Sequence, residues 1–183
     1  MLGDKADPSL MEGMVQDIAD IDAVINQFLY FARVGGEQSA ATECDLDEII
    51  SSVAERYKRQ SVAIQARRGG VPRLQLKSMA IQRLITNLVE NALRHGSAEV
   101  EIETARMENG VRLSVLDRGP GIPPDDAERM LQPFTRLNSA RSTSGSGLGL
   151  AIVDRIAKMH RGRVQLLPRD GGGLEALIEL PLT

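Results

Sequence analysis

Apolar residues recur every three or four positions between residues 9 and 33, the spacing of a helix that packs against another helix. The pattern predicts a long helix whose apolar seam needs a partner, and Gly35 with Gly36 ends it. The polar stretch that follows, up to Glu43, is typical of a linker. We therefore divide the chain into residues 1–36, a linker at 37–44 and a globular domain at 45–183.

The globular part mixes helical and strand patterns. Asp45 and Glu48 have the spacing of a capping box and open a helix that we expect to end near Gln60. Strands are predicted at residues 62–66, 73–76, 98–105, 111–117, 163–167 and 174–180, with a hairpin turn at Asn109-Gly110. Further helices are predicted at residues 77–95 and 147–160, with a short one near 125–131 inside a long loop rich in glycine, proline and serine.

This order of elements predicts an α+β fold. We expect a two-layer α/β sandwich, with helices on one face of a mixed, mostly antiparallel sheet, preceded by one long helix. A chain of 183 residues has room for one such core and not for two full domains.

Composition excludes several classes of function. The net charge of -3, with charges of both signs interspersed and few aromatic residues, argues against a nucleic-acid partner. Cys44 is the only cysteine, so there is no disulfide framework, which suits a reducing compartment. No run approaches the ~18 apolar residues of a membrane-spanning helix, and no signal peptide is recognisable. These features predict a soluble, cytoplasmic domain.

Polar residues line up at four-residue spacing on the helix predicted at 77–95, at Asn87, Asn91 and His95. Asparagine is a mediocre helix former because its side chain competes for backbone hydrogen bonds, so two on one stripe indicate a polar ligand or an ion. The carbonyl oxygen of Asn91 is suited to a Mg²⁺ shell shared with phosphates. A solvated helix flank would explain isolated asparagines equally well.

A carboxylate and two glycines follow the strand predicted at 111–117, in the run Asp117-Arg118-Gly119-Pro120-Gly121-Ile122. Glycine lets the backbone approach a flat ligand closely. Asp117 can accept a hydrogen bond from an exocyclic amine such as that of adenine, which guanine does not offer at the same position. Taken alone, the run also fits a turn capped by aspartate.

Glycines alternate where the helix predicted at 147–160 begins, in the run Gly145-Ser146-Gly147-Leu148-Gly149-Leu150. Backbone amides at a helix start can hold phosphate oxygens without a lysine. The run is not a P-loop, because Leu150 and Ala151 stand where lysine and a hydroxyl residue would, and its spacing does not fit a dinucleotide fingerprint. A flexible linker before a helix is the alternative.

In this order and spacing the motifs resemble the nucleotide-binding boxes of sensor histidine kinases, which belong to the GHKL superfamily with its Bergerat ATP-binding fold. Residues 87–92 correspond to the N box, 117–121 to the G1 box, 133–134 to the F box and 145–150 to the G2 box. The resemblance begins near Met11, and its helix is similar to the second helix of the dimerisation and phosphotransfer domain. Finer features, such as residues 132–136 and 139–141, resemble EnvZ-type osmosensor kinases.

The resemblance implies a Mg-ATP site and a role for each matching residue. Asn91 would bind Mg²⁺, Asn87 would line the phosphate side, and Arg94 would reach phosphate. Asp117 would read the adenine amine, with His95 flanking the ring. The remaining residues expected at the nucleotide are Gly119 and Gly121, which would admit the ring, Ile122, Phe134 packing the lid, Arg136 and Arg141, and Gly145, Ser146, Gly147, Leu148 and Gly149 in the lid. For the two loop arginines, a solvated basic loop is an equal explanation.

The resemblance also implies what the chain lacks. In this family the phosphoaccepting histidine is followed by an acidic residue and a downstream proline, and neither His95 nor His160 fits this pattern. We expect the chain to bind Mg-ATP without phosphorylating itself. For the intact protein, the resemblance implies transfer of the γ-phosphate to a histidine of its own dimerisation domain and then to a response regulator. It also implies that the full-length protein lies in the bacterial inner membrane.

Two further expectations and two alternatives remain. The apolar seam of the first helix predicts self-association, such as a homodimer. Asn87 stands where ATPases of the superfamily place a glutamate base, which favours a kinase over a hydrolase. The alternatives are another GHKL enzyme, such as a chaperone-like ATPase or a serine kinase, and a nucleotide-gated interaction module.

Overall fold

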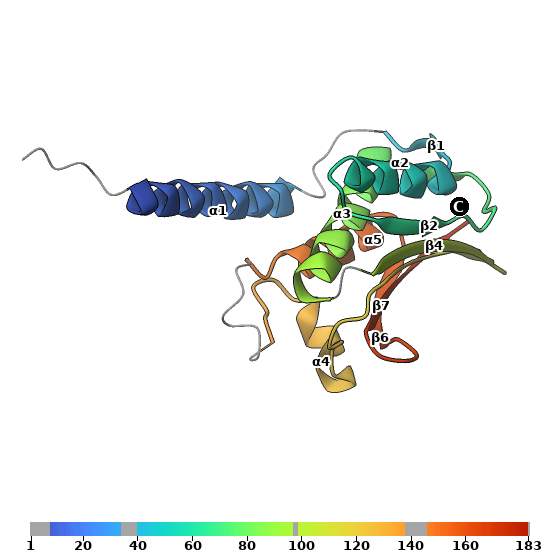
Figure 1. Cartoon of the computed structure of the whole chain (residues 1–183). Coiled ribbons are helices and arrows are strands. Elements are labelled where there is room, and N and C mark those ends of the chain that lie inside the picture. Colours follow the sequence, from blue (N-terminus) through green and yellow to red (C-terminus); the bar gives the residue numbers. More distant parts are fainter. Residues whose placement is uncertain (1–7, 34–39, 97–98, 138–145, 183) are drawn as a thin grey trace, which may run out of the picture.

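The computed structural model describes residues 8–33, 40–96, 99–137 and 146–182. A long helix, α1 (Pro8–Arg33), leads away from a domain in which helices cover one face of a sheet (Figure 1). The α+β fold class predicted from the sequence is confirmed. Within these described ranges, no helix combines the length and the apolar character needed to cross a membrane.

The main sheet has five strands in the order β2-β4-β5-β7-β6. Their bounds are Ile64–Arg67 for β2, Val100–Met107 for β4, Gly110–Leu116 for β5, Arg163–Pro168 for β6 and Leu174–Pro181 for β7. β2 and β4 are parallel and the other neighbouring strands are antiparallel, so the sheet is mixed and mostly antiparallel, as predicted. β4 and β5 form the expected hairpin.

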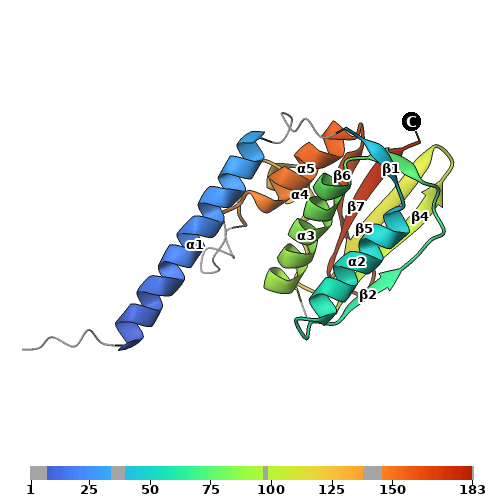
Figure 2. The same cartoon turned by 90° about the horizontal axis from the view of Figure 1, so that it is seen from above.

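Helices α2 (Leu46–Lys58), α3 (Ser78–His95) and α5 (Gly149–Met159) form the second layer, which Figure 2 shows from above. A shorter helix, α4 (Pro124–Met130), follows β5. The apolar stripe of α3 lies in the centre of the core, since Ile81, Leu84 and Ile85 have no exposed surface. Burial of each such side chain contributes roughly 1.5–3 kcal/mol, which fixes how α3 is rotated on the sheet.

The stretch interpreted as a linker ends in a strand. β1 (Thr42–Cys44) pairs antiparallel with β3 (Leu74–Leu76), and Thr42 lies opposite Leu76. A strand of three residues is too short to show a period of two. Its partner lies far along the chain, with 32 positions separating Cys44 from Leu76, so the local pattern does not reveal the pairing.

The apolar seam of α1 is exposed to solvent. Met14, Ile18 and Ile21 each expose more than half of their surface, at 57%, 58% and 58%. The helix itself is where its spacing predicted it. Self-association through this seam, and the division of the chain at residue 36, stay predictions.

His160 connects two helices of the second layer. Its Nε2 accepts a hydrogen bond from the backbone N–H of Lys77 at 3.0 Å, and its Nδ1 lies 2.9 Å from the carbonyl oxygen of Ile156. Because a carbonyl only accepts, Nδ1 carries the proton and the imidazole is neutral. Lys77 is the N-cap of α3 and its side chain makes no capping bond, so His160 satisfies one backbone donor at this helix start. Burial lowers the pKa of His160.

We expect acid to destabilise the protein through His160. Because its pKa is lower in the folded chain, its contribution to stability is complete above about pH 6.5 and is lost as the pH falls toward the folded value. The unfolding temperature should decrease from about pH 7.5 to about pH 5.5. It should decrease less in His160→Gln, whose amide accepts from Lys77 at either pH. Equal decreases in both proteins would contradict this role.

Candidate functional site

A pocket opens between α3, the loop after β5, the segment 130–137 and the start of α5. The residues predicted at the nucleotide that line it are Asn87, Asn91, Arg94, His95, Asp117, Gly121, Ile122, Arg136, Ser146, Gly147 and Gly149. Arg141 and Gly145 lie outside the described residues. Motifs that are far apart in the sequence therefore meet at one place in the fold.

Asn87 and Asn91 line the pocket from α3, next to the stripe that faces the core. Asn87 is only 4% exposed, so it does not lie on a solvated flank. Its Nδ2 donates to the carbonyl oxygen of Arg83 at 3.0 Å, which fixes the orientation of the amide. Asn91 is half-buried one turn later, and its side chain is available to a ligand.

Asp117 follows β5 and is held by the backbone on two sides. Its N–H donates to the carbonyl oxygen of Leu174 at 3.0 Å, which extends the pairing of β5 with β7. Its Oδ1 accepts from the N–H of Gly119 at 2.7 Å and from the N–H of Leu174 at 3.3 Å. The side chain is nearly buried and lines the pocket, so Oδ2 can accept from a ligand while Oδ1 is occupied.

Two glycines bring main chains together around the pocket. Gly147 has a φ of +70°, in the left-handed region that favours glycine, and so does Gly121 at +71°. A Cβ on Gly147 would lie 2.9 Å from the carbonyl carbon of Phe134. The N–H of Phe134 also donates to the carbonyl oxygen of Gly147 at 3.0 Å. The segment 130–137 and the glycine loop therefore touch backbone to backbone.

Some residues expected at the nucleotide do not line the pocket, namely Gly119, Phe134 and Leu148. Gly119 packs against the end of α3, where a Cβ would come within 2.6 Å of the Cα of Gly96. Leu148 is fully buried in the core. Phe134 as a residue is 62% exposed, and the structure does not show the expected packing of its ring. Its contact with the glycine loop is made by its main chain, which has a φ of 62°.

Positive charge surrounds His95 in the pocket. Partial burial, and then the charges of Arg94 and Arg136, lower the pKa of His95. The imidazole is therefore neutral at pH 7, and the two guanidinium groups supply the attraction for an anionic ligand.

Gln27 of α1 lines the pocket although nothing in its local pattern marks it. Its Nε2 donates to Asn87 Oδ1 at 3.5 Å, and its Oε1 accepts from Ser146 Oγ at 2.5 Å. Gln27 thus bridges the asparagine stripe and the glycine loop. Arg155 Nη1 donates to the carbonyl oxygen of Phe31 at 2.8 Å and holds this end of α1 on α5. Other lining residues that the motifs did not single out are Glu90, Pro120, Met130, Thr135, Leu137, Leu150 and Leu174.

The side-chain oxygens of α3 that could bind a metal ion at the pocket belong to the amides of Asn87 and Asn91 and the carboxylate of Glu90. Mg²⁺ in phosphate-binding sites keeps several waters and takes few protein ligands besides the phosphates. This donor set therefore fits an ion that arrives with phosphate. Among the described residues there is no group of three or more His, Cys, Asp or Glu side chains that could hold a metal.

Residues 76–183 match the protein family described as histidine kinase-, DNA gyrase B-, and HSP90-like ATPase. The alginate biosynthesis sensor protein KinB of Pseudomonas aeruginosa is 31% identical over 182 residues. The match covers 94% of this chain and 30% of KinB, so the chain spans less than a third of that relative.

Solved structures share the fold. Full-length ShkA in complex with AMPPNP has a TM-score of 0.78 at 25% identity, covering 98% of this chain and 40% of ShkA. The histidine kinase domain of the E. coli osmosensor EnvZ has a TM-score of 0.63 at 32% identity, covering 81% of this chain and 92% of that domain. EnvZ is one relative among several, so these comparisons support membership of the sensor histidine kinases and do not favour the EnvZ-type kinases over other members.

We expect Gly147→Ala and Gly149→Ala to have different effects. Alanine at 147 must adopt a left-handed φ against Phe134, which costs roughly 1–3 kcal/mol. Alanine at 149, in α5, would meet only Asn87 Oδ1 at 3.9 Å and should be neutral or favourable by up to about 1 kcal/mol. Hydrogen exchange at the Phe134 amide should accelerate in the first variant only. Similar exchange in both would contradict the backbone contact.

Proposed function

This chain belongs to the histidine kinase-, DNA gyrase B-, and HSP90-like ATPase family, and from that premise we propose how its pocket works. The chain is the ATP-binding catalytic domain of a two-component sensor histidine kinase. We propose that Mg-ATP binds with adenine at Asp117 and phosphates toward Asn91 and the glycine loop. The convergence of Asn91, Asp117 and Gly147 on one pocket is the observation that carries this proposal.

Asp117 is suited to reading the adenine amine. Two backbone N–H groups bind its Oδ1, so Oδ2 can accept from an exocyclic amine. A guanine would present a carbonyl oxygen at that position, which cannot donate and would be repelled by the carboxylate. The neutral His95 ring can flank the base without adding charge.

The phosphates would lie toward α3 and the glycine loop. Asn91 would supply an amide oxygen to Mg²⁺, with Asn87 on the phosphate side. Arg94 and Arg136, which also line the pocket, would reach phosphate oxygens. When bound, Mg²⁺ neutralises charge on the phosphates. The chain's own part is to orient the γ-phosphate and to compensate its charge.

The pocket favours transfer to an external acceptor over hydrolysis. An amide cannot take a proton from water at neutral pH, and Asn87 stands where a glutamate base would be needed. The Asn87 amide is also committed to the carbonyl oxygen of Arg83. We therefore do not expect Asn87 to activate a water molecule.

In the intact protein, we propose transfer from ATP to a histidine of a dimerisation domain and onward to a response regulator. The exposed seam of α1 supports its assignment to that domain, which includes residues 1–36 and is joined to the catalytic part by 37–44. Placement of the full-length protein in the inner membrane, a homodimer through α1 and an EnvZ-type identity are further parts of the proposal.

Calorimetric titration with a non-hydrolysable ATP analogue tests the site. We expect binding that depends on Mg²⁺ in the parent chain. Asp117→Asn should weaken it by roughly tenfold to a hundredfold, because an acceptor oxygen for the amine is replaced by a donor. Asn91→Ala should lose the dependence on Mg²⁺, because the metal would lose its protein ligand.

Matched controls are Asp125→Asn and Asn109→Ala, which alter residues of the same types outside the pocket. Both should bind like the parent. An absence of binding by the folded parent chain, or loss of binding in the controls to the same degree, would rule out the proposed site.

We expect Gln27→Ala to bind the ATP analogue about twofold to tenfold more tightly than the parent. Gln27 occupies hydrogen-bonding groups of Asn87 and Ser146 on the side where phosphates would bind, so the nucleotide must displace it. Asn26→Ala, on the neighbouring exposed position of α1, is the control. Weaker binding by Gln27→Ala alone would mean that the glutamine contacts the nucleotide itself.

A further inference from the structure

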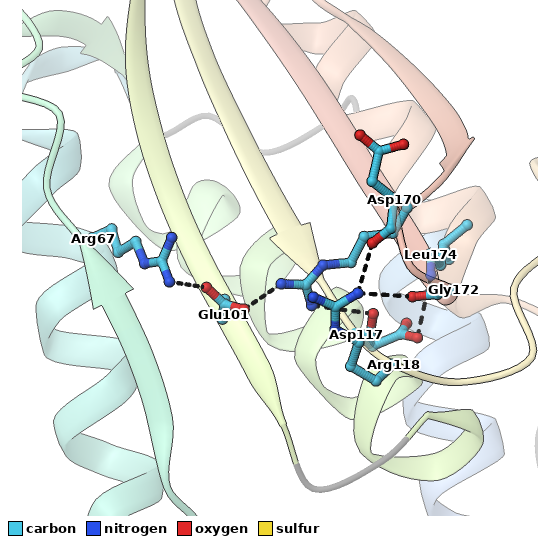
Figure 3. Close-up of polar contacts among 8 residues, drawn as sticks. Arg67, Glu101, Asp117, Arg118, Asp170, Gly172 and Leu174 are labelled. Atoms are coloured by element: carbon cyan, nitrogen blue, oxygen red, sulfur yellow. Dashed lines mark hydrogen bonds and ion pairs between the residues drawn. The ribbon is translucent and has the colours of Figure 1, made fainter.

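A series of polar contacts crosses the sheet and ends at Asp117 (Figure 3). It begins at Arg67 of β2, whose Nη2 lies 2.6 Å from Glu101 Oε2 on β4. Glu101 alternates with the buried Val100 and Ile102, so it lies on the sheet face that the helices leave open. These contacts therefore approach the pocket edge from behind the sheet.

Arg169, in the turn between β6 and β7, is the centre of these contacts. Its Nη2 pairs with Glu101 Oε1, and its Nη1 donates to the main-chain oxygen of Asp117 at 3.2 Å. The two side chains of the ion pair are only 10% and 14% exposed. The hydrogen bond from Arg169 is the main reason why the pKa of Glu101 is lowered, so this carboxylate stays charged at neutral pH. A shielded guanidinium with two acceptors is held in one geometry, unlike most surface pairs.

The turn that carries Arg169 is pressed against Asp117. Gly173 has a φ of +110°, and a Cβ there would collide with the main-chain oxygen of Asp117. From the outer side, Arg118 Nη1 donates to the carbonyl oxygen of Asp170 at 2.7 Å. The Asp117-Arg118 segment therefore accepts a hydrogen bond from this turn and donates one to it, as dashed lines in Figure 3 show.

We propose that Arg169 is a positioning residue for adenine recognition, which holds the Asp117 peptide against the β6–β7 turn with Glu101 as its anchor. This inference rests on the proposed function, in which Asp117 reads the adenine amine. Arg169 donates a hydrogen bond to the carbonyl oxygen of Asp117. The main chain of Leu174 binds both the N–H and the Oδ1 of Asp117. The direction of Oδ2 is then set by these sheet contacts together with the N–H of Gly119, which also binds Oδ1.

The consequence is selective for the base. A hydrogen bond weakens steeply as its angle departs from linearity, so a small rotation of the carboxylate costs the amine contact. The residues expected on the phosphate side, Asn91 and Gly147, belong to α3 and the glycine loop and make no described contact with Arg169. Loss of Arg169 should therefore reduce the preference for adenine more than it reduces nucleotide binding in general.

The test compares two non-hydrolysable nucleotides that differ only in the exocyclic amine, an ATP analogue and its purine riboside counterpart. Affinities are measured by calorimetry with Mg²⁺, and the readout is their ratio. We expect the parent to favour the amine by roughly tenfold or more, and Asp117→Asn to lose this preference. Arg169→Met should lower the ratio to about threefold or less, and Arg169→Lys, which keeps one donor group, should restore part of it.

Arg163→Met is the matched control, because it removes another Arg–Glu pair of the sheet, which joins Arg163 of β6 to Glu179 of β7. Its ratio should equal that of the parent. Should Arg169→Met fail to fold, Glu101→Ala removes the anchor and is expected to lower the ratio in the same way.

Two outcomes would overturn the inference while leaving the proposed function intact. One is an unchanged ratio in folded Arg169→Met and Glu101→Ala, and the other is an equal loss of affinity for both nucleotides. If the parent chain itself does not distinguish the two nucleotides, the proposal that Asp117 recognises the adenine amine is wrong. The positioning role of Arg169 is then wrong as well.

Discussion

The packing of α3 on the sheet is the interaction on which the rest of the domain depends. Ile81, Leu84 and Ile85 are fully buried, and successive residues of a helix are rotated by about 100°. No other rotation of α3 would keep these three side chains in the core, so Asn87 and Asn91 can only border the pocket. Asparagine favours neither a helix nor an apolar boundary, and such local conflicts are expected at sites retained for a ligand. The stability of the core and the direction of the Asn91 amide are therefore two results of one packing arrangement.

The pocket joins two walls of different construction. The wall proposed to hold the base is built on the sheet, where Asp117 is bound through its N–H, its main-chain oxygen and its Oδ1. The wall proposed to face the phosphates includes, among its described contacts, the backbone bond between Phe134 and Gly147 and the side-chain bridge of Gln27. If the base and the phosphates bind as proposed, a base wall fixed by the sheet favours selectivity for the base, whereas a phosphate wall tied to α1 lets the position of that helix influence nucleotide binding. The structure thus contains a physical connection between a helix outside the sandwich and the catalytic pocket.

Features that repeat along the chain could be predicted from the sequence, and features that depend on distant partners could not. The stripe of α3, the β4–β5 hairpin and the order of the glycine motifs have local signals, and the structure brings these motifs to one pocket. The pairing of β1 with β3, the bridge of Gln27 and the ion pair of Arg169 with Glu101 join residues far apart in sequence, for which periodicity carries no information. Phe134 shows a different limit, since its motif was informative while the contact is made by its main chain and not by its ring.

The most direct measurement is a crystal structure of this chain with Mg²⁺ and a non-hydrolysable ATP analogue. The adenine amine should lie at about 3 Å from Asp117 Oδ2, with Mg²⁺ bound by the amide oxygen of Asn91 at about 2.1 Å. Arg169 of the β6–β7 turn should still donate to the main-chain oxygen of Asp117, and the hydrogen bond between Gln27 and Asn87 should be broken. A nucleotide bound elsewhere, or one in this pocket with its amine away from Asp117, would contradict the proposed site.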